Sequence, residues 1–217
     1  MTEADFLAKT RTAYDTIAAE YAERTRGELE VKPLDRALLV AFADLVREDG
    51  PGPVADLGCG PGTVTAFLHD RGLDVFGIDL SPRMVALARR AHPGLRFEEG
   101  SMTALDLADG ALSGLVAWYS IIHTPPEALP GVFAEFHRVL TPGGRALLAF
   151  QVDDQPRHLT QWFGHEISLD LTRPSPERAA DLLGRAGLVV QARLLREPAD
   201  DGLEKVPRIG LLARKPA

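Results

Sequence analysis

Hydrophobic side chains recur along this chain with two different spacings, and each spacing predicts a type of element. Apolar or aromatic residues follow a helical period from Phe6 to Tyr21 and again from Leu34 to Val46, so two helices with one buried face each are expected there. From residue 54 to residue 150, short apolar runs alternate with further helical patterns. Such an alternation favours parallel strands joined by right-handed crossovers. The pattern therefore predicts a three-layer α/β fold.

The apolar runs give the strands of the expected sheet. Strands are predicted over residues 54–57, 74–79, 95–98, 112–122, 145–150, 188–195 and 206–213. Ser81 and Ser175 each precede a Pro at the start of a helical pattern, so both are predicted N-caps. The last two strands flank an acidic loop at Asp200-Asp201-Gly202. We expect them to form a hairpin-like pair at the edge of the sheet.

The other elements are organised around the stretch Val54-Ala55-Asp56-Leu57-Gly58-Cys59-Gly60-Pro61-Gly62, which is followed by a helical run over residues 63–71. An apolar run that enters three glycines and leaves into a helix predicts a buried strand, a tight turn and a helix N-terminus. Gly58, Gly60 and Gly62 have no Cβ, so a ligand can lie against their main chain. The helix end adds unpaired N–H groups and a partial positive charge. The turn is thus a predicted binding loop.

The spacing of the glycines and two nearby acids narrow the class of ligand. A dinucleotide fingerprint would have a glycine where this chain has Thr63, so the pattern is G-x-G-x-G rather than G-x-G-x-x-G. Asp56, beside the turn, would repel phosphates and could hold a cation. Asp79 ends the next apolar run about 20 residues on, where doubly wound sheets bind ribose hydroxyls. These features argue against a pyrophosphate ligand.

Three motifs in chain order resemble those of a known family. They are the glycine stretch at 54–62, then Gly77-Ile78-Asp79-Leu80-Ser81, then Arg138-Val139-Leu140-Thr141-Pro142-Gly143-Gly144. Together they resemble the motifs of the class I, Rossmann-like S-adenosylmethionine (SAM) dependent methyltransferases. The resemblance implies a seven-stranded, mostly parallel sheet with an antiparallel edge strand, SAM as cofactor and S-adenosylhomocysteine (SAH) as product. It also implies methyl transfer by in-line displacement, and the aromatic side chains of residues 151–174 suggest that the acceptor is a small, partly apolar molecule.

Most candidate cofactor-binding residues are expected at the carboxyl ends of the first four strands. Tyr14 and Tyr21 are expected on the N-terminal helix. Those after the fourth strand lie on the crevice side, where open α/β sheets bind ligands. The set is Tyr14, Tyr21, Asp56, Gly58, Cys59, Gly60, Gly62, Asp79, Leu80, Ser101, Met102, Trp118, Tyr119 and Ser120. Two positions depart from the family pattern, which commonly has an acid where this chain has Ser101 and usually one where it has Gly114. Both departures bear on how the cofactor is held.

The whole chain, residues 1–217, is expected to form a single methyltransferase domain. Within it, residues 1–30 are the expected helical lid, because the resemblance includes an N-terminal helix whose Tyr14 and Tyr21 lie over the cofactor pocket. Residues 151–174 are polar, hold aromatic and histidine side chains, include a strand-like run from Ile167 to Leu171, and break the strand–helix alternation. A segment of this length is more often functional than idle. We interpret it as a substrate cap.

Candidate catalytic groups depend on the acceptor atom, which can be O, N or C. A hydroxyl or amine acceptor gains from a base, and histidine titrates in the right range. His123, after the fourth strand, and His158 and His165, in the expected cap, are the candidates, whereas a carbon or thiol acceptor can need none. The lone Cys59 is expected to fill a tight turn rather than act as a nucleophile. No Cys/His cluster has metal-ligand spacing, so no metal is expected.

The chain has a formal net charge of −7 and no run of Lys or Arg, so neither nucleic acid nor an anionic membrane is an expected partner. The chain shows no secretory signal and no long apolar stretch, which makes a cytoplasmic enzyme, monomeric or homodimeric, the expectation. Two alternatives stay open. One is a catalytically silent module that binds SAM or SAH, because fold does not settle function. The other is an NAD-dependent oxidoreductase, against which Thr63 and Asp56 argue.

Overall fold

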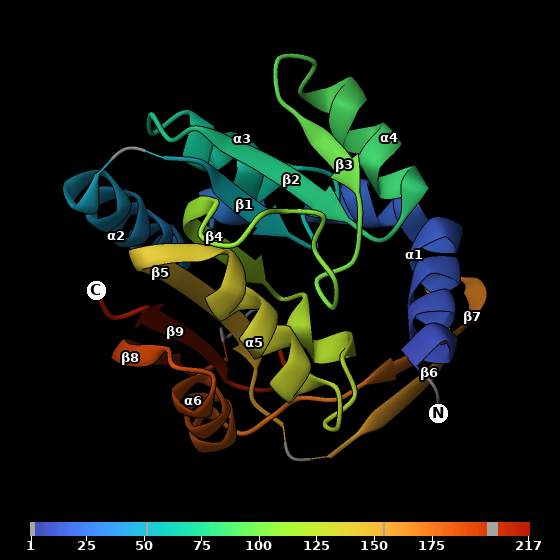
Figure 1. The fold of residues 1–217 in the computed structure, drawn as a ribbon. Helices are drawn as coiled ribbons and strands as arrows, with labels where there is room; N and C mark the ends of the chain where they lie inside the picture. Colours follow the sequence, from blue (N-terminus) through green and yellow to red (C-terminus); the bar gives the residue numbers. More distant parts are fainter. Residues whose placement is uncertain (1–2, 51, 154, 199–203) are drawn as a thin grey trace.

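A central sheet organises the computed structural model, which describes residues 3–50, 52–153, 155–198 and 204–217 (Figure 1). Its strand order is β3-β2-β1-β4-β5-β9-β8, and a separate two-stranded sheet pairs β6 with β7. The strands are β1 (Val54–Leu57), β2 (Val75–Asp79), β3 (Phe97–Glu99), β4 (Leu112–Trp118), β5 (Leu140–Gln151), β6 (Arg157–Trp162), β7 (His165–Leu171), β8 (Val189–Arg196) and β9 (Arg208–Arg214).

Helices cover both faces of the large sheet. They are α1 (Glu3–Thr25), α2 (Pro33–Asp49), α3 (Thr63–His69), α4 (Pro82–Ala91), α5 (Leu129–Val139) and α6 (Pro176–Arg185), with short 3₁₀ turns at Glu28–Glu30 and Ile121–His123. Apolar side chains of α2 and α3 pack on one face of the sheet. Those of α5 and α6 pack on the other face. None of the helices in the described ranges is long and apolar enough to cross a membrane.

The predicted fold class is confirmed. Strands β1 to β5 pair in parallel, and β9 runs antiparallel to both of its neighbours. The antiparallel strand β9 lies one place in from the edge, because β8 occupies the outermost position. The two predicted N-caps are also present, since the hydroxyls of Ser81 and Ser175 accept hydrogen bonds from the N–H groups of Met84 and Arg178. The loop at Asp200-Asp201-Gly202 lies outside the described residues.

Strand β5 begins earlier than the sequence pattern predicted. We expected it at Arg145, but Leu140 already pairs with Leu112 of β4, and the register then shifts before Gly114 pairs with Arg145. The intervening residues include Gly143, whose φ of +82° is the left-handed conformation that glycine adopts without strain. The turn residues Pro142, Gly143 and Gly144 therefore form an irregular part of strand β5 rather than a loop before it.

Residues 151–174 contain a β-hairpin rather than a mostly irregular segment. The expected strand at Ile167 to Leu171 forms the end of β7, whereas β6 was not predicted, because most of its side chains are exposed on both faces. The hairpin lies beside α1, although the two are far apart in sequence (Figure 1). The contact between α1 and the hairpin brings together the predicted lid, residues 1–30, and the predicted cap, residues 151–174.

Candidate functional site

The glycine loop follows β1 with three left-handed residues. Gly58, Gly60 and Gly62 have φ angles of +72°, +54° and +88°. A Cβ added at Gly58 would lie only 2.4 Å from the Cβ of Ser120, so the loop backbone sits directly against the exit of β4. The sequence needs glycine here for two reasons, the backbone conformation and this close approach.

The carboxyl group of Asp79 ties the end of β2 to this loop. One oxygen accepts the N–H of Gly60 and the other accepts the N–H of Ser81, both at 2.8 Å. Burial raises the pKa of Asp79 to about 6, while hydrogen bonds from the N–H groups of Ser81 and Gly60 oppose the rise. The side chain is therefore mostly ionised at neutral pH and keeps free lone pairs for a ligand.

Asp56 is a buried carboxyl group with one unused oxygen. Its Oδ2 accepts the hydroxyl of Thr65 at 2.7 Å, while Oδ1 is buried and has no hydrogen-bond partner among the described residues. Burial raises the pKa of Asp56 to about 7. A buried acceptor without a partner is costly unless a ligand supplies a donor. A cationic ligand group is the chemistry that fits it best.

A cleft of about 800 Å³ opens at the carboxyl ends of the strands. This is the end of the strands at which open α/β sheets bind ligands. Of the predicted residues, those that line it are Tyr14, Tyr21, Gly58, Gly60, Asp79, Leu80, Ser101, Met102, Trp118, Tyr119, Ser120 and His123. A neighbouring hollow of about 530 Å³ is lined by Asp56 and Cys59 and shares Tyr21, Gly58, Gly60, Trp118 and Tyr119 with the cleft.

Helix α1 contributes more of the wall than the sequence suggested. The unforeseen lining residues are Phe6, Leu7, Thr10, Arg11, Leu57, Ile78, Ser81, Met84, Gly100, Thr103 and Thr124. Arg11 Nε donates to the carbonyl of Leu80 at 3.2 Å, and the Asp15 carboxylate accepts the Ser81 hydroxyl at 2.5 Å. These two bonds fix α1 over the end of β2. Phe6, Leu7, Thr10 and Arg11 lie one and two helical turns before Tyr14. Their spacing could have indicated that this part of α1 also lines the cleft.

Three of the predicted site residues lie outside the lining of the cleft and of the hollow. Gly62 is the N-cap residue of α3, and a Cβ there would meet the ring of Phe97 at 2.8 Å. The imidazole of His158 faces Asp170 at 2.7 Å on the exposed hairpin. That of His165 lies 3.3 Å from Glu20 of α1, also exposed. The hairpin turns both histidines toward its own surface rather than into the cleft.

The remaining histidine candidate does line the cleft. His123 Nε2 lies 2.7 Å from the hydroxyl of Tyr14, and the two rings meet edge to face with centroids 5.1 Å apart. Burial lowers the pKa of His123 to about 4; the backbone of Asp170 opposes this shift and the charge of Arg173 adds to it. The imidazole is therefore neutral at pH 7, which is the form that accepts a proton.

The single cysteine has none of the features of a nucleophile. Burial raises the pKa of the Cys59 thiol well above its ordinary value, and the charges of Asp79 and Asp56 act in the same direction. Only the thiolate is nucleophilic, so this environment suits a side chain that fills space. Among the residues that the structure describes, no group of His, Cys, Asp and Glu is arranged to hold a metal ion.

Comparison with known proteins places this geometry in a family. Residues 54–144 match the model of a methyltransferase domain. The chain is 35% identical over 136 residues to demethylmenaquinone methyltransferase of Beutenbergia cavernae, covering 63% of this chain and 55% of that protein. It is 34% identical over 191 residues to trans-aconitate 2-methyltransferase of Rhizobium meliloti, covering 84% of this chain and 64% of that protein.

The fold is also similar to that of solved structures. The structure of 1,6-didemethyltoxoflavin-N1-methyltransferase of Burkholderia thailandensis, with bound 1,6-didemethyltoxoflavin and SAH, superposes with a TM-score of 0.70 at 20% identity. The match covers all of this chain and 92% of that one. The chain spans 55 to 64% of the length of the two curated relatives described above.

The fold, the glycine loop and the acid at the end of β2 are those of the class I SAM-dependent methyltransferases, whose cofactor is SAM and whose product is SAH. Residues 54–144 of this chain match the methyltransferase domain. The resemblance found in the three sequence motifs is thereby confirmed.

Proposed function

We propose that this protein transfers a methyl group from SAM to a small-molecule acceptor in the 800 Å³ cleft. The observation that carries the proposal is that one cleft is lined both by the glycine loop with Asp79 and by the neutral imidazole of His123. The first group suits the methyl donor and the second suits the acceptor. The named relatives act on a quinone precursor, an organic acid and a heterocycle, which supports a small acceptor and leaves its reacting atom open.

The residues of the loop fit the cofactor in polarity and shape. Asp79 would accept the ribose hydroxyls, and the glycine backbone would lie against the ligand. Ser101 and Met102 would contact the adenine, with the thioether against its face. The unpaired Oδ1 of Asp56 would take the amino group of the methionine portion. When bound, SAM supplies a methyl group made electrophilic by the sulfonium sulfur.

His123 would act on the acceptor rather than on the cofactor. Its neutral ring would remove the proton that a hydroxyl or amine loses as it is methylated. The Tyr14 hydroxyl at 2.7 Å orients the ring and limits its rotation. Helix α1, within the lid of residues 1–30, and the cap of residues 151–174 would exclude water, since a closed site favours in-line attack.

The direct test is methyl transfer itself. The purified protein is incubated with methyl-labelled SAM and a panel of hydroxyl, amine, carboxylate and activated-carbon acceptors, and labelled products and SAH are separated by chromatography. We expect stoichiometric SAH and labelled acceptor with at least one class. SAH binding without turnover of any acceptor would favour the silent binding module, and NAD-dependent oxidation would favour the oxidoreductase.

A further inference from the structure

A second polar cluster lies beside the cleft, at the carboxyl ends of β4 and β5. Gln151, the last residue of β5, pairs with Arg208, the first residue of β9, so both side chains leave the same face of the sheet. The guanidinium of Arg208 lies 5.6 Å from the ring centroid of Tyr119. Tyr119 lines the cleft and has a left-handed φ of +55°, which is uncommon for a residue other than glycine.

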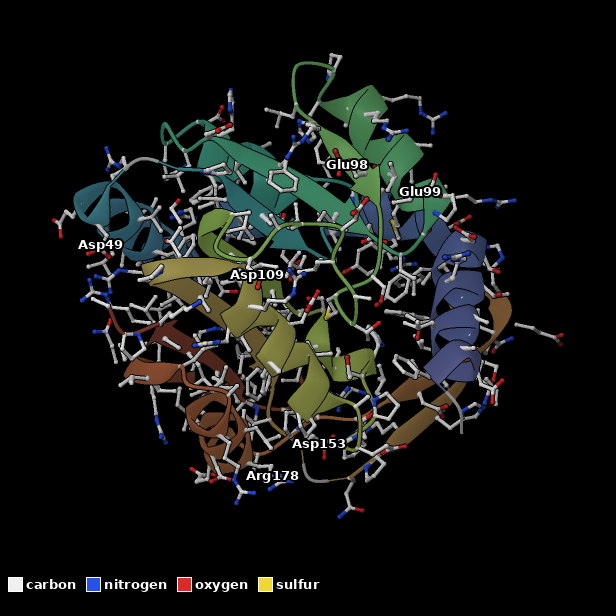
Figure 2. The ribbon with its side chains drawn as sticks, in the orientation of Figure 1. Asp49, Glu98, Glu99, Asp109, Asp153 and Arg178 are labelled. Atoms are coloured by element: carbon white, nitrogen blue, oxygen red, sulfur yellow. The ribbon has the colours of Figure 1, made fainter. Side chains whose placement is uncertain are left out.

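Arg173 completes this cluster from the chain that leaves β7. Its side chain is only 9% exposed, and Nη1 donates to Asp153 Oδ2 at 2.7 Å. In the view of Figure 2, Asp153 lies below α5, on the side of the hairpin β6–β7. The charge of Arg173 reaches His123, whose pKa it helps to lower. The guanidinium group of Arg173 therefore lies close to the imidazole of His123.

Three buried polar atoms of this cluster lack hydrogen-bond partners among the described residues. They are Nε of Arg173, Nε of Arg208 and Oε1 of Gln151. Arg208 Nε lies 3.2 Å from Glu204 Oε1 without forming a hydrogen bond. Burial and the charges of Arg157 and Arg208 lower the pKa of Arg173, while Asp153 opposes them. Two guanidinium groups in one enclosed place, each with an unused N–H, form a site for an anion.

We propose that Arg173 and Arg208 bind a carboxylate of the acceptor, so that the substrate is a small organic acid. The inference rests on the proposed methyl transfer and specifies its substrate class. Guanidinium groups match the planar carboxylate with paired N–H donors. With its amide turned, Gln151 would donate its NH₂ group to the same carboxylate. The anchored carboxylate is not the methylated group; the reacting atom lies toward His123 and the cleft.

A purely structural ion pair is the competing explanation, and the chain offers a matched control for it. Arg157 also contacts Asp153, at 3.2 Å, but its side chain is 49% exposed. Both arginines therefore pair with the same carboxylate, and only Arg173 is enclosed with an unused N–H. Loss of Arg157 removes an ion pair of Asp153 without touching the proposed anion site.

The test compares acids with their amides in the full-length protein. Citrate and 4-hydroxybenzoate, which each carry a hydroxyl group besides their carboxyl groups, are offered with SAM beside the amides in which every carboxyl group is blocked, and SAH release is followed. We expect at least one acid to be methylated while its amide is not, with a free carboxylate retained in the product by NMR. Arg173→Gln and Arg208→Gln should each raise the KM for that acid at least tenfold, and Arg173→Lys should recover part of the loss.

The controls separate this inference from the proposed function. Calorimetry with SAH should give the same Kd, within twofold, for the wild type, Arg173→Gln and Arg157→Gln, which also shows that the variants fold. Arg157→Gln should keep the wild-type KM for the acid. Equal use of acid and amide, no turnover of any acid, or an unchanged KM in Arg173→Gln would overturn the acidic acceptor. Loss of SAH binding by the wild type would instead count against methyl transfer.

Discussion

Burial changes the acid–base behaviour of individual residues around the cleft. Asp56 and Asp79 are carboxyl groups with raised pKa values, and His123 is an imidazole with a lowered one. In each case desolvation, which disfavours the charged form, is the largest cause. At neutral pH this gives a neutral imidazole in the wall of the cleft and acids that a cationic ligand would help to ionise. The cleft is thus poised for ligand binding at a cost to the stability of the ligand-free fold.

Asp56 should reveal that cost through pH. Its pKa is about 7 in the folded protein and about 4 in an unfolded chain, so the unfolded state ionises first and stability falls as pH rises between these values. Asp56→Asn cannot ionise. Relative to the wild type, we expect this variant to gain roughly 1–3 kcal/mol in free energy of unfolding between pH 5 and pH 8. Urea unfolding at the two pH values measures it, and a pH-independent difference would contradict the assignment.

His123 should govern turnover rather than cofactor affinity. Removing a general base lowers the rate by about 10²-fold or more, so His123→Ala should lower kcat by that amount and leave the Kd for SAH within twofold. Because the pKa of His123 is about 4, its protonation should cause no loss of kcat between pH 8 and pH 6. Steady-state assays with an active acceptor test both points. Wild-type turnover in the variant would remove His123 from the mechanism.

At the scale of elements, the strand–loop–helix unit from β1 to α3 holds the cofactor loop against its neighbours. Its glycines are not equivalent. A Cβ at Gly58 would collide with Ser120, whereas one at Gly60 would meet only the ring of Tyr21 at 3.9 Å. Both residues have left-handed backbone. Gly58 is therefore constrained by its close approach to the exit of β4, whereas Gly60 is constrained only by its backbone conformation.

The two glycines make a matched pair of variants. Gly60→Ala should cost about 1 kcal/mol of stability for its left-handed backbone. Gly58→Ala adds a forced displacement of Ser120 and should cost about 2–4 kcal/mol. Urea unfolding of both variants gives the comparison. Equal losses would show that the loop does not pack on the exit of β4 as described.

The hairpin β6–β7 docks on α1 through aromatic rings and exposed ion pairs. Trp162 meets Tyr14 and Tyr21 edge to face, with centroids 6.0 and 5.9 Å apart. The ion pairs, of His165 with Glu20 and of Lys9 with Asp170, are solvent-exposed. Exposed pairs contribute little, whereas aromatic contacts are worth about 0.5–1.5 kcal/mol each beyond their buried area. The rings should therefore dominate the docking.

Alanine variants of the hairpin distinguish these contributions. Trp162→Ala should cost about 1–3 kcal/mol of stability and weaken SAH binding, because it loosens the helix that carries Tyr14 and Tyr21. His158→Ala and His165→Ala should stay within about 0.5 kcal/mol of the wild type and keep turnover within twofold. Chemical unfolding and initial rates measure these effects. A large loss of kcat in either histidine variant would place that side chain in the reaction.

The residues that sequence reasoning could place differ in kind from those it could not. The loop at Gly58 to Gly62 and the acid Asp79 are fixed by local turn chemistry and strand ends, so their pattern is continuous in sequence. His158 and His165 could not be assigned, because only the packing of the hairpin decides which way they face. Arg173 and Arg208 were not foreseen, since isolated charges meet only through the register of β5 with β9 and the exit of β7.

At the scale of the whole molecule, the carboxyl ends of β1, β2 and β4 meet helix α1 from the first half of the chain and the hairpin β6–β7 from the second half. Ligand binding at this junction should stabilise the entire fold. A ligand at 100 times its Kd adds about 2.7 kcal/mol, which raises Tm by about 2–4 °C per kcal/mol for a domain of this size.

Calorimetric titration with SAH, with NAD titrated in parallel and Asp79→Ala as the variant, shows whether the glycine loop and Asp79 bind the methyl donor. We expect SAH to bind the wild type at one site, NAD not to bind, and Asp79→Ala to weaken SAH binding by roughly 1.5–3 kcal/mol, the worth of hydrogen bonds to a charged group. Binding of NAD with no response to SAH, or undiminished SAH affinity in Asp79→Ala, would contradict this expectation.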